Sequence, residues 1–477
     1  MNREVSPPPL KRQRRDHNAR VVHHTDEHQI PACLAHAHEG SLRIYAWNIN
    51  GVSPYIQPYF QRSLDSFFQP SLKQRKRRPT QTDSSSSDNE SHNRASFFDP
   101  EREEDPGREP EPSLRAVLRR QKWPHFLLLQ EVKIKPGDQM TMKAVQMAIN
   151  DPLPSTALHL QPGSPSHPTD TLPDGGPRYK VYFNLPRDRY NAKGFGGKVY
   201  GVATLIRQDF ANQYIERVRN VDWDLEGRIS VIETKPFPLP LCPSPTAPSD
   251  TISPSRKTLK LSLINIYAVN GTSNPYFSPS TGEPTGETRH THKLSLHTHL
   301  LRECNALLSQ SYEVILAGDL NIAPSAIDGH PNLRTWPEQH VRNRKDFTTK
   351  FLLPTSSPLS NHIQPNFNTK ITPFPGLDTF RLLHPLTKQY SYHPGGRGTS
   401  KHSFESSCDR VDLMICSQGL GAWIKGAGIC ESVRDRGRSD HCPVWVEVGV
   451  SRGERAGEND EGEEDGAVRE GGILREE

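Results

Sequence analysis

Short apolar runs recur along the chain, each ending in polar residues or glycine, and they predict β-strands. A run of about four to eight apolar or alternating positions is typical of a buried strand. The sequence also predicts helices at 113–118, capped by Ser113, and at 293–309. Strands with helices between some of them favour an α/β sandwich of sheets. The predicted strands lie at 43–47, 126–129, 180–183, 200–206, 228–233, 259–267, 313–317, 410–416 and 443–450.

Other stretches lack any such pattern, so the chain divides into folded and unfolded parts. An arm at 1–40 and a long insert at 62–112 cannot bury enough apolar surface to offset the entropy of ordering, and we expect both to be disordered. Residues 41–450 would form one folded domain, followed by a disordered acidic tail at 451–477. Within that domain, loops rich in Pro, Gly or Ser are expected at 151–178, 236–257 and 272–290.

Composition agrees with a folded core diluted by inserts. Hydrophobic residues make up 33% of the chain, while Pro (43) and Gly (33) are frequent. The net charge of +4 understates the charge of the body, because the tail carries ten acidic residues against four Arg. A basic body fits a polyanionic partner such as a nucleic acid, although solubility alone is another explanation.

The sequence also bears on location. The seven cysteines are scattered without a C-x-x-C pair, as is typical of reduced thiols in an intracellular protein. Neither a signal peptide nor an apolar run of membrane-spanning length is visible, so we expect no membrane association. Basic clusters at 11–15 and 73–78 favour nuclear import, with non-specific nucleic-acid contact or a solvated charge run as alternatives. We therefore expect a nuclear protein.

Polar residues with metal- and phosphate-binding chemistry repeatedly follow the predicted strands. Any one of them has a simpler explanation as a turn residue, since Asn and Asp favour turns. Together they predict a cleft lined by oxygen ligands and one histidine at an edge of the sheets. These residues are Asn48, Asn50, Glu131, Asp319, Asn321, Asp412, Asp440 and His441.

Individual positions suggest separate tasks. Glu131 follows four apolar residues and would hold Mg²⁺ at the mouth of the core, with a salt bridge to Lys133 as the alternative. Asp319 and Asn321 alternate to the same side, so one could activate water while the other binds a phosphate oxygen. His441 could act as a cationic donor if Asp412 raises its pKa.

Competing motifs are weak. The glycine-rich segments 194–197 and 395–398 lack the spacing and the Lys-Ser/Thr of a phosphate-binding loop. No H-E-x-x-H motif occurs. A local histidine group is interpreted as a solvated surface between a loop and a helix, not as a zinc site. Its members are His290, His292, His297 and His299.

Five motifs, in order, resemble the signature blocks of the exonuclease III family of apurinic/apyrimidinic endonucleases, within the endonuclease/exonuclease/phosphatase superfamily. Weaker similarities are Glu226-Gly-Arg228 and the segment 265–270. The resemblance covers about 41–61 and 113–450. The five motifs are Trp47-Asn-Ile-Asn-Gly51, Leu129-Gln-Glu131, Gly318-Asp-Leu-Asn-Ile-Ala-Pro324, Arg410-Val-Asp412 and Ser439-Asp-His-Cys-Pro443.

This resemblance implies a four-layer α/β sandwich and Mg²⁺-dependent hydrolysis, with Mn²⁺ as an alternative metal. It implies cleavage of DNA 5′ to abasic sites, often with 3′ exonuclease or 3′-repair activity. By motif, Glu131 would bind the metal, helped by Asn50 and Asp440, and Asp319, Asn321 and His441 are also assigned as metal-site residues. Asp319 would activate water. Asn48 and Asn321 would hold the phosphate, and His441, oriented by Asp412, would stabilise charge on phosphorus.

The resemblance also implies a substrate pocket. Tyr267 and Asn270 would line the scissile phosphate and the leaving group, and Tyr392 would face the extruded sugar. Asp409 stands where the family usually has an aromatic residue, and Asn50 stands where eukaryotic members often have Asp. Two other hypotheses stay open: a superfamily enzyme acting on RNA, inositol phosphates or lipids, and a non-catalytic DNA-binding scaffold. The sequence leaves the oligomeric state undetermined.

Overall fold

The computed structural model describes residues 41–56, 113–153, 174, 176–192, 200–238, 258–353, 372–394 and 407–449. The arm at 1–40, the insert at 62–112 and the tail at 451–477 lie outside these residues, as do most of the loops 151–178 and 236–257. The expected division into arm, domain and tail therefore stays a prediction.

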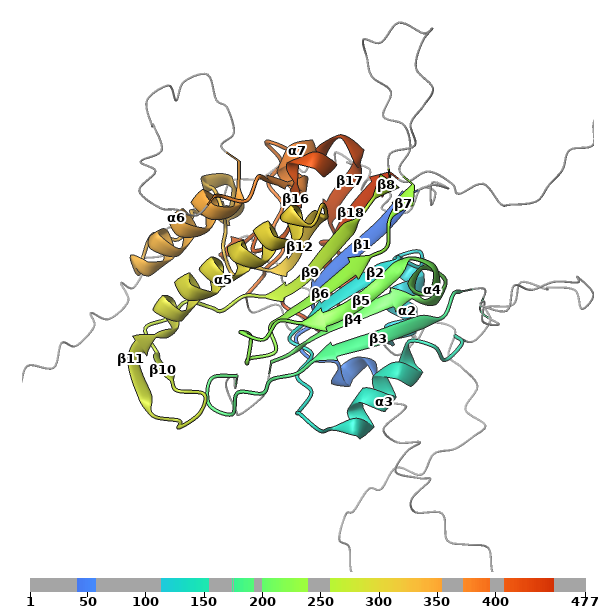
Figure 1. The fold of residues 1–477 in the computed structure, drawn as a ribbon, viewed down its shortest axis with the longest axis horizontal. Coiled ribbons are helices and arrows are strands. Elements are labelled where there is room, and N and C mark those ends of the chain that lie inside the picture. The colour runs from blue at the N-terminus through green and yellow to red at the C-terminus, as the bar shows by residue number, and fades with distance from the viewer. Residues whose placement is uncertain are drawn as a thin grey trace, which may run out of the picture. The chain divides into compact units, whose positions relative to one another are not determined.

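Two six-stranded mixed sheets form the centre of the fold (Figure 1). Each has a parallel pair in its middle, β1 with β2 in the first sheet and β9 with β12 in the second, and all its other neighbours are antiparallel. The first sheet has the order β17 (Ile424–Ile429), β18 (Val444–Gly449), β1 (Ser41–Asn48), β2 (Phe126–Gln130), β4 (Val202–Arg207) and β3 (Tyr179–Asn184). The second has the order β14 (Gly376–Asp378), β16 (Asp412–Ser417), β12 (Glu313–Asp319), β9 (Leu261–Tyr267), β6 (Ile229–Thr234) and β5 (Ile215–Asn220).

Side chains alternate across each strand, and this alternation builds the layers. In β1, Ile44 and Ala46 face a core shared with Leu263 of β9 and Ile315 of β12, so the two sheets pack face to face. The outward Trp47 packs in a second core with α2 (Leu114–Arg120) and α3 (Gln139–Ala148). A third core joins the outer face of the second sheet to α5 (Arg289–Ser309) and α6 (Gln339–Phe351). The four-layer α/β sandwich is confirmed.

Shorter elements connect these layers. Among the described residues they include the helices α4 (Gln208–Tyr214), α7 (Thr379–Leu383) and α8 (Val433–Arg436). Three two-stranded ribbons pair β10 (Pro275–Phe277) with β11 (Pro284–Thr288), β13 (Gly329–His330) with β15 (Cys408–Asp409), and β7 (Phe237–Pro238) with β8 (Thr258–Leu259). None of the helices in the described segments has the length and apolarity that a membrane span requires.

The structure corrects several boundaries. The expected loop 272–290 contains the β10–β11 ribbon, and α5 begins at Arg289 because Thr288 and Thr291 form a reciprocal capping box ahead of the apolar positions. The strand expected at 410–416 begins only at Asp412. Sequence reasoning missed β5, an edge strand with a half-exposed pattern, and α6, whose apolar face is short. Ser113 caps α2 as predicted.

Candidate active site

The polar residues after the central strands meet because both parallel pairs end at the same edge of the sandwich. Asn48, at the end of β1, is fully buried, and its Nδ2 donates to Glu131 Oε1 (3.1 Å) and Asp319 Oδ2 (3.0 Å). Gln130 of β2 donates to Asn265 of β9 across the same interface (2.8 Å). The predicted convergence of distant strand ends is therefore present in the structure.

Three of these residues have left-handed backbones. Asn50, Glu131 and Asn321 have φ angles of 54°, 49° and 51°, which residues other than glycine seldom adopt. Each follows the end of β1, β2 or β12 by one or two residues. Such conformations persist where the surrounding structure holds them, and they concentrate at functional sites.

Glu131 and Asn50 share one positive charge. Lys133 Nζ lies 3.0 Å from Glu131 Oε2 and also donates to Asn50 Oδ1, so the salt bridge considered as an alternative does form. Burial opposes the ionisation of Glu131, but Lys133 and hydrogen bonds from Tyr267 and Asn48 outweigh it and lower its pKa. Carboxylate and amide oxygens around a cation are the ligand set of a hard divalent ion, so these residues fit Mg²⁺ or Mn²⁺.

Asp440 lies behind this group. Its Oδ1 accepts a hydrogen bond from Asn50 Nδ2 (2.8 Å), so the carboxylate orients the Asn50 amide with its oxygen toward Lys133. Asp440 also lines the pocket described below. A cation replacing the Lys133 ammonium would therefore find a second carboxylate close by.

His441 is held by the carboxylate of Asp412. Its Nδ1 lies 2.8 Å from Asp412 Oδ2, and both side chains are buried. Burial lowers the pKa of His441, but the charges of Asp412, Asp319 and Asp440 more than compensate and raise it to about 10. The ligand atoms of Asp319, Asp412 and His441 lie within 4.8 Å of one another and could also hold a metal ion, but only with the imidazole neutral.

Asp319 has a pKa suited to proton transfer. Burial and then the neighbouring Asp412 charge raise it to about 7, because both oppose ionisation. Its Oδ1 accepts the Asn321 backbone N–H (2.8 Å), while its Oδ2 accepts from Asn48 (3.0 Å). A carboxyl group with a pKa near the ambient pH can serve as a general base.

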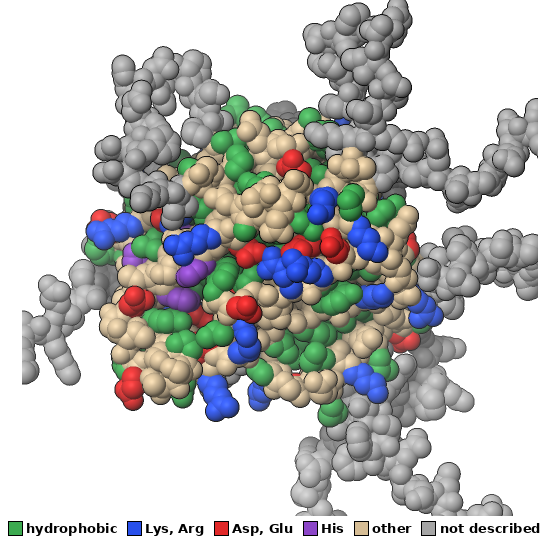
Figure 2. All heavy atoms as spheres, in the orientation of Figure 1, with side chains coloured by type: hydrophobic (Ala, Val, Ile, Leu, Met, Phe, Trp, Pro, Cys, Tyr) green, Lys and Arg blue, Asp and Glu red, His purple; other side chains and the backbone are tan. Residues whose placement is uncertain are grey.

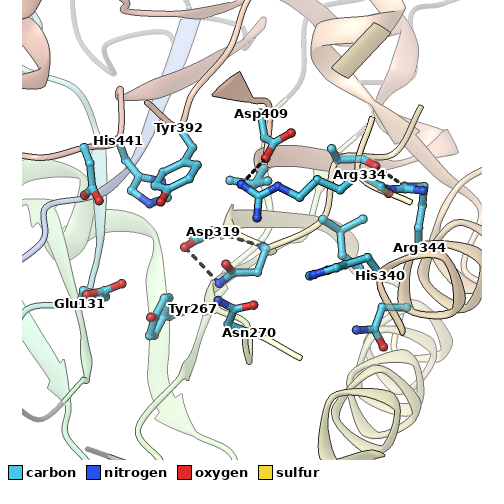
Figure 3. Close-up of a pocket in the computed structure, with 16 residues that line it drawn as sticks. Glu131, Tyr267, Asn270, Asp319, Arg334, His340, Arg344, Tyr392, Asp409 and His441 are labelled. Carbon is cyan, nitrogen blue, oxygen red and sulfur yellow. Dashed lines mark hydrogen bonds and ion pairs between the residues drawn. The ribbon is translucent and has the colours of Figure 1, made fainter. Parts of the chain in front are cut away.

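Several of these groups line one cavity, whose residues are drawn in Figure 3 and whose volume is about 200 Å³. We call one side the strand-end wall, defined by Glu131, Asp319 and His441, which project from the ends of β2 and β12 and from the segment before β18. Asn48, Asn50 and Asp412 do not line the cavity but hydrogen-bond to residues that do. The predicted residues that line it are Glu131, Tyr267, Asn270, Asp319, Asn321, Tyr392, Asp440 and His441.

Two tyrosines line the cavity. Tyr267, at the end of β9, lies against Glu131, and the Arg228 guanidinium sits 4.8 Å from its ring centre. The Tyr392 ring lies 4.8 Å from the His441 ring. Tyr392 also pairs with the Asp409 backbone in an isolated β-bridge, which places both residues on the cavity.

The opposite side of the cavity was not foreseen. We call it the rim wall, formed by Arg334, His340, Asn343 and Arg344 from α6 and the segment before it. Arg334 lies 3.0 Å from Asp409, which also lines the cavity. The rim wall stands on an irregular segment and a mostly polar helix without motif, so the sequence offered no signal beyond its cluster of basic residues.

The histidine group was interpreted wrongly in part. His297 is completely buried, with its Nδ1 2.8 Å from Asp346 of α6, because α5 packs on α6 at this point. His292 lies 2.9 Å from the buried carboxylate of Glu226 and stacks on Tyr276. Histidine side chains do reach the surface over α5 (Figure 2), but the group as a whole is not solvated.

One family profile and several solved structures match this chain. The profile of the Endonuclease/Exonuclease/phosphatase family matches residues 46–441. No curated protein matches the sequence. Similar solved structures include the Xenopus laevis APE2 catalytic domain, with 16% identity over 86% of this chain and 94% of that chain and a TM-score of 0.45. They also include the AP endonuclease LMAP of Leishmania major (14%, 86% and 89%, TM-score 0.45) and an AP endonuclease of Archaeoglobus fulgidus (14%, 85% and 98%, TM-score 0.44).

The profile match extends from within β1 to His441 and therefore spans most of the chain, including both sheets and the strand-end wall. The chain belongs to the Endonuclease/Exonuclease/phosphatase family and, with it, to the hydrolases.

Proposed function

We propose that this protein is a Mg²⁺-dependent DNA phosphodiesterase of base-excision repair that cleaves the backbone 5′ to abasic sites and processes blocked 3′ ends. One observation supports this most strongly. Three side chains from distant segments face one cavity, and each has a different charge state. Glu131 is anionic, Asp319 titrates near neutrality and His441 is cationic. Metal binding, water activation and charge stabilisation need these three states.

In this proposal the water oxygen bonds to phosphorus while the bond from phosphorus to the 3′ oxygen breaks. Asp319 takes the proton of the water, and the departing oxygen takes a proton from solvent to become a 3′ hydroxyl. His441, held by Asp412, donates to a phosphate oxygen as negative charge builds up. Asn321, Asn270 and Tyr392 contact the substrate.

Asn48 was expected to hold the phosphate. Its amide nitrogen is already bonded to Glu131 and Asp319, so we assign it the orientation of both carboxylates. Tyr267 hydrogen-bonds to Glu131 and so helps to orient its carboxylate. Mg²⁺ (or Mn²⁺) would be held by Glu131, Asn50 and Asp440, and it would neutralise charge on the phosphate.

The choice of DNA rests on the five motifs and on charge. The rim wall contributes Arg334 and Arg344 to the cavity, and cationic side chains beside a phosphate-binding site suit a polyanion. We also propose that the catalytic domain spans 41–450, and that the basic clusters at 11–15 and 73–78 direct the protein to the nucleus. Loss of nuclear fluorescence in a fusion protein lacking both clusters would support that location.

The decisive test is turnover by the purified full chain. We expect cleavage of a labelled duplex bearing an abasic-site analogue or a blocked 3′ end, with Mg²⁺ and not with EDTA. An undamaged duplex reports any exonuclease activity. RNA, phosphoinositide and inositol phosphate substrates form the comparison set, and preferential hydrolysis of one of them would contradict the proposal. DNA binding without any turnover would favour a scaffold.

A further inference from the structure

One tryptophan is exposed beside the cavity. Trp47 is buried, and Trp123, Trp223, Trp423 and Trp445 are each partly covered by neighbouring residues. Trp336, in the segment between β13 and α6, is 83% exposed. A large, solvent-exposed aromatic ring on a folded domain is informative, because the other tryptophans of the chain are buried or partly covered.

The segment that carries Trp336 is anchored to the rim wall. Arg344 Nη2 donates to the Arg334 carbonyl (2.7 Å), while its Nε donates to the carbonyl of Ala323 (2.8 Å), close to the end of β12. The Arg334 side chain points back to Asp409 across the cavity (Figure 3). Because Trp336 is two residues from Arg334, its Cα lies within about 7 Å of the Arg334 Cα.

Charge around this tryptophan favours one class of partner. Residues 329–353 contain five Lys and Arg against two Asp and Glu. The Arg334 and Arg342 side chains are 46% and 64% exposed. An aromatic ring among cations beside a phosphate-binding cavity is the combination that nucleic-acid proteins use to stack bases while neutralising the backbone. An apolar protein surface would gain little from the surrounding cations.

We propose that the Trp336 indole stacks on a nucleobase one or two nucleotides from the scissile phosphate, and so fixes the register of the strand in the cavity. Neighbouring phosphates lie about 3.4 Å apart along the axis of one strand of duplex DNA, so the reach from Arg334 fits this spacing. This inference rests on the proposed function, because it requires a nucleic-acid substrate. It adds a binding element outside the strand-end wall.

The test compares Trp336→Ala and Trp336→Phe with the wild type in fluorescence-anisotropy titrations of an abasic-analogue duplex, without Mg²⁺. Loss of stacking should weaken binding about 5- to 100-fold in the alanine variant, and phenylalanine should restore most of it. The slope of log Kd against log salt should stay unchanged, because no phosphate contact is removed. Leu386→Ala is the matched control, since Leu386 is also 83% exposed.

Turnover supplies the second readout. With Mg²⁺, Trp336→Ala should raise KM while kcat stays within about twofold, since the indole touches no reacting atom. Unchanged affinity in Trp336→Ala, or a phenylalanine variant as weak as alanine, would overturn the inference. If the wild type cleaves DNA and Trp336→Ala binds and cleaves it equally well, only the stacking is refuted. A wild type that neither binds nor cleaves DNA refutes the proposed function itself.

Discussion

The two walls of the cavity differ in how they are built. On the strand-end wall, Asp319 ends β12, Glu131 follows β2 and His441 precedes β18, and hydrogen bonds to Asn48 and Asp412 fix them in place. On the rim wall, Arg334 and His340 come from an irregular segment and the first turn of α6, and the Arg334 side chain is 46% exposed. The first wall is held by the core of the fold, and the second lies at its surface.

This difference suggests a division of labour. Groups that must transfer protons or hold a metal need fixed geometry and a low dielectric, which the sheet edge provides. Groups that only attract and align a polyanion can remain solvated. Substitutions on the strand-end wall should therefore change kcat, while those on the rim wall should change KM.

The largest effect is expected from Asp319→Asn, because it removes the proposed base without changing side-chain size. We expect kcat to fall about 10²- to 10⁴-fold. In Glu131→Gln, kcat should fall as far, and the variant should also require more Mg²⁺ to reach its half-maximal rate. DNA affinity without metal should stay within about threefold of the wild type. Asp222→Asn, an exposed carboxylate away from the cavity, is the control. Turnover surviving both substitutions would remove these residues from the mechanism.

Asp412→Asn should move the pH profile as well as lower it. Activity needs a protonated His441, so wild-type activity should fall as pH rises through about 10. Without Asp412, burial lowers the His441 pKa with less opposition, so this loss should begin at lower pH. The acid limb should also shift to lower pH. The Asp412 charge helps raise the Asp319 pKa to about 7, so removing that charge lowers the Asp319 pKa. At pH 8 to 9 we expect a loss of about 10²-fold.

A steady-state profile from pH 5 to 11 on the abasic-analogue duplex measures both limbs. Asp209→Asn removes a carboxylate that is paired with Arg207 outside the cavity and controls for general effects of charge. A profile that is lowered but not displaced would show that Asp412 has only a structural role.

The strand-end wall could be predicted because its chemistry is tied to strand patterns. Asp319 and Glu131 directly follow apolar runs. His441 lies just before β18, a strand that its alternating valines reveal in the sequence. The rim wall could not, since nothing in the sequence specifies which loop folds back over the cavity. That placement depends on long-range contacts, such as Arg344 with the Ala323 carbonyl and Arg334 with Asp409. His297 was misjudged for the same reason, since its burial depends on α6, a helix that the apolar pattern did not reveal.

Opposite substitutions in the Arg334–Asp409 pair should have opposite effects. Arg334→Gln removes a cation from the rim wall, so KM should rise about tenfold and the salt slope of binding should fall by about one. Asp409→Asn removes the carboxylate that competes with DNA for Arg334, so KM should fall. In both variants kcat should change less than about threefold. Binding titrations at several salt concentrations measure these effects, with Lys180→Gln on β3 as control. Equal losses in both variants would instead mean that the pair only supports the fold.

The last effect concerns the stability of the support beneath the rim wall, not turnover. Burial lowers the pKa of His297 to about 4, so the unfolded chain, with its ordinary value near 6.5, binds this proton more readily. Stability from this group is therefore complete above pH 6.5 and is lost as pH falls to 4, by at most about 3 kcal/mol. Protonation would also leave a second N–H buried, since within the described segments His297 Nε2 has no partner.

Urea unfolding between pH 4.5 and 7 should show a flatter dependence in His297→Gln than in the wild type, whatever its stability at pH 7. His299→Gln, from the same helix but only partly buried, should keep the wild-type slope more closely. Because His297 bonds to Asp346, hydrogen exchange in α6 should quicken at pH 5 before that of β1 or β12 does. Simultaneous loosening of both walls would mean that the rim wall is part of the core after all.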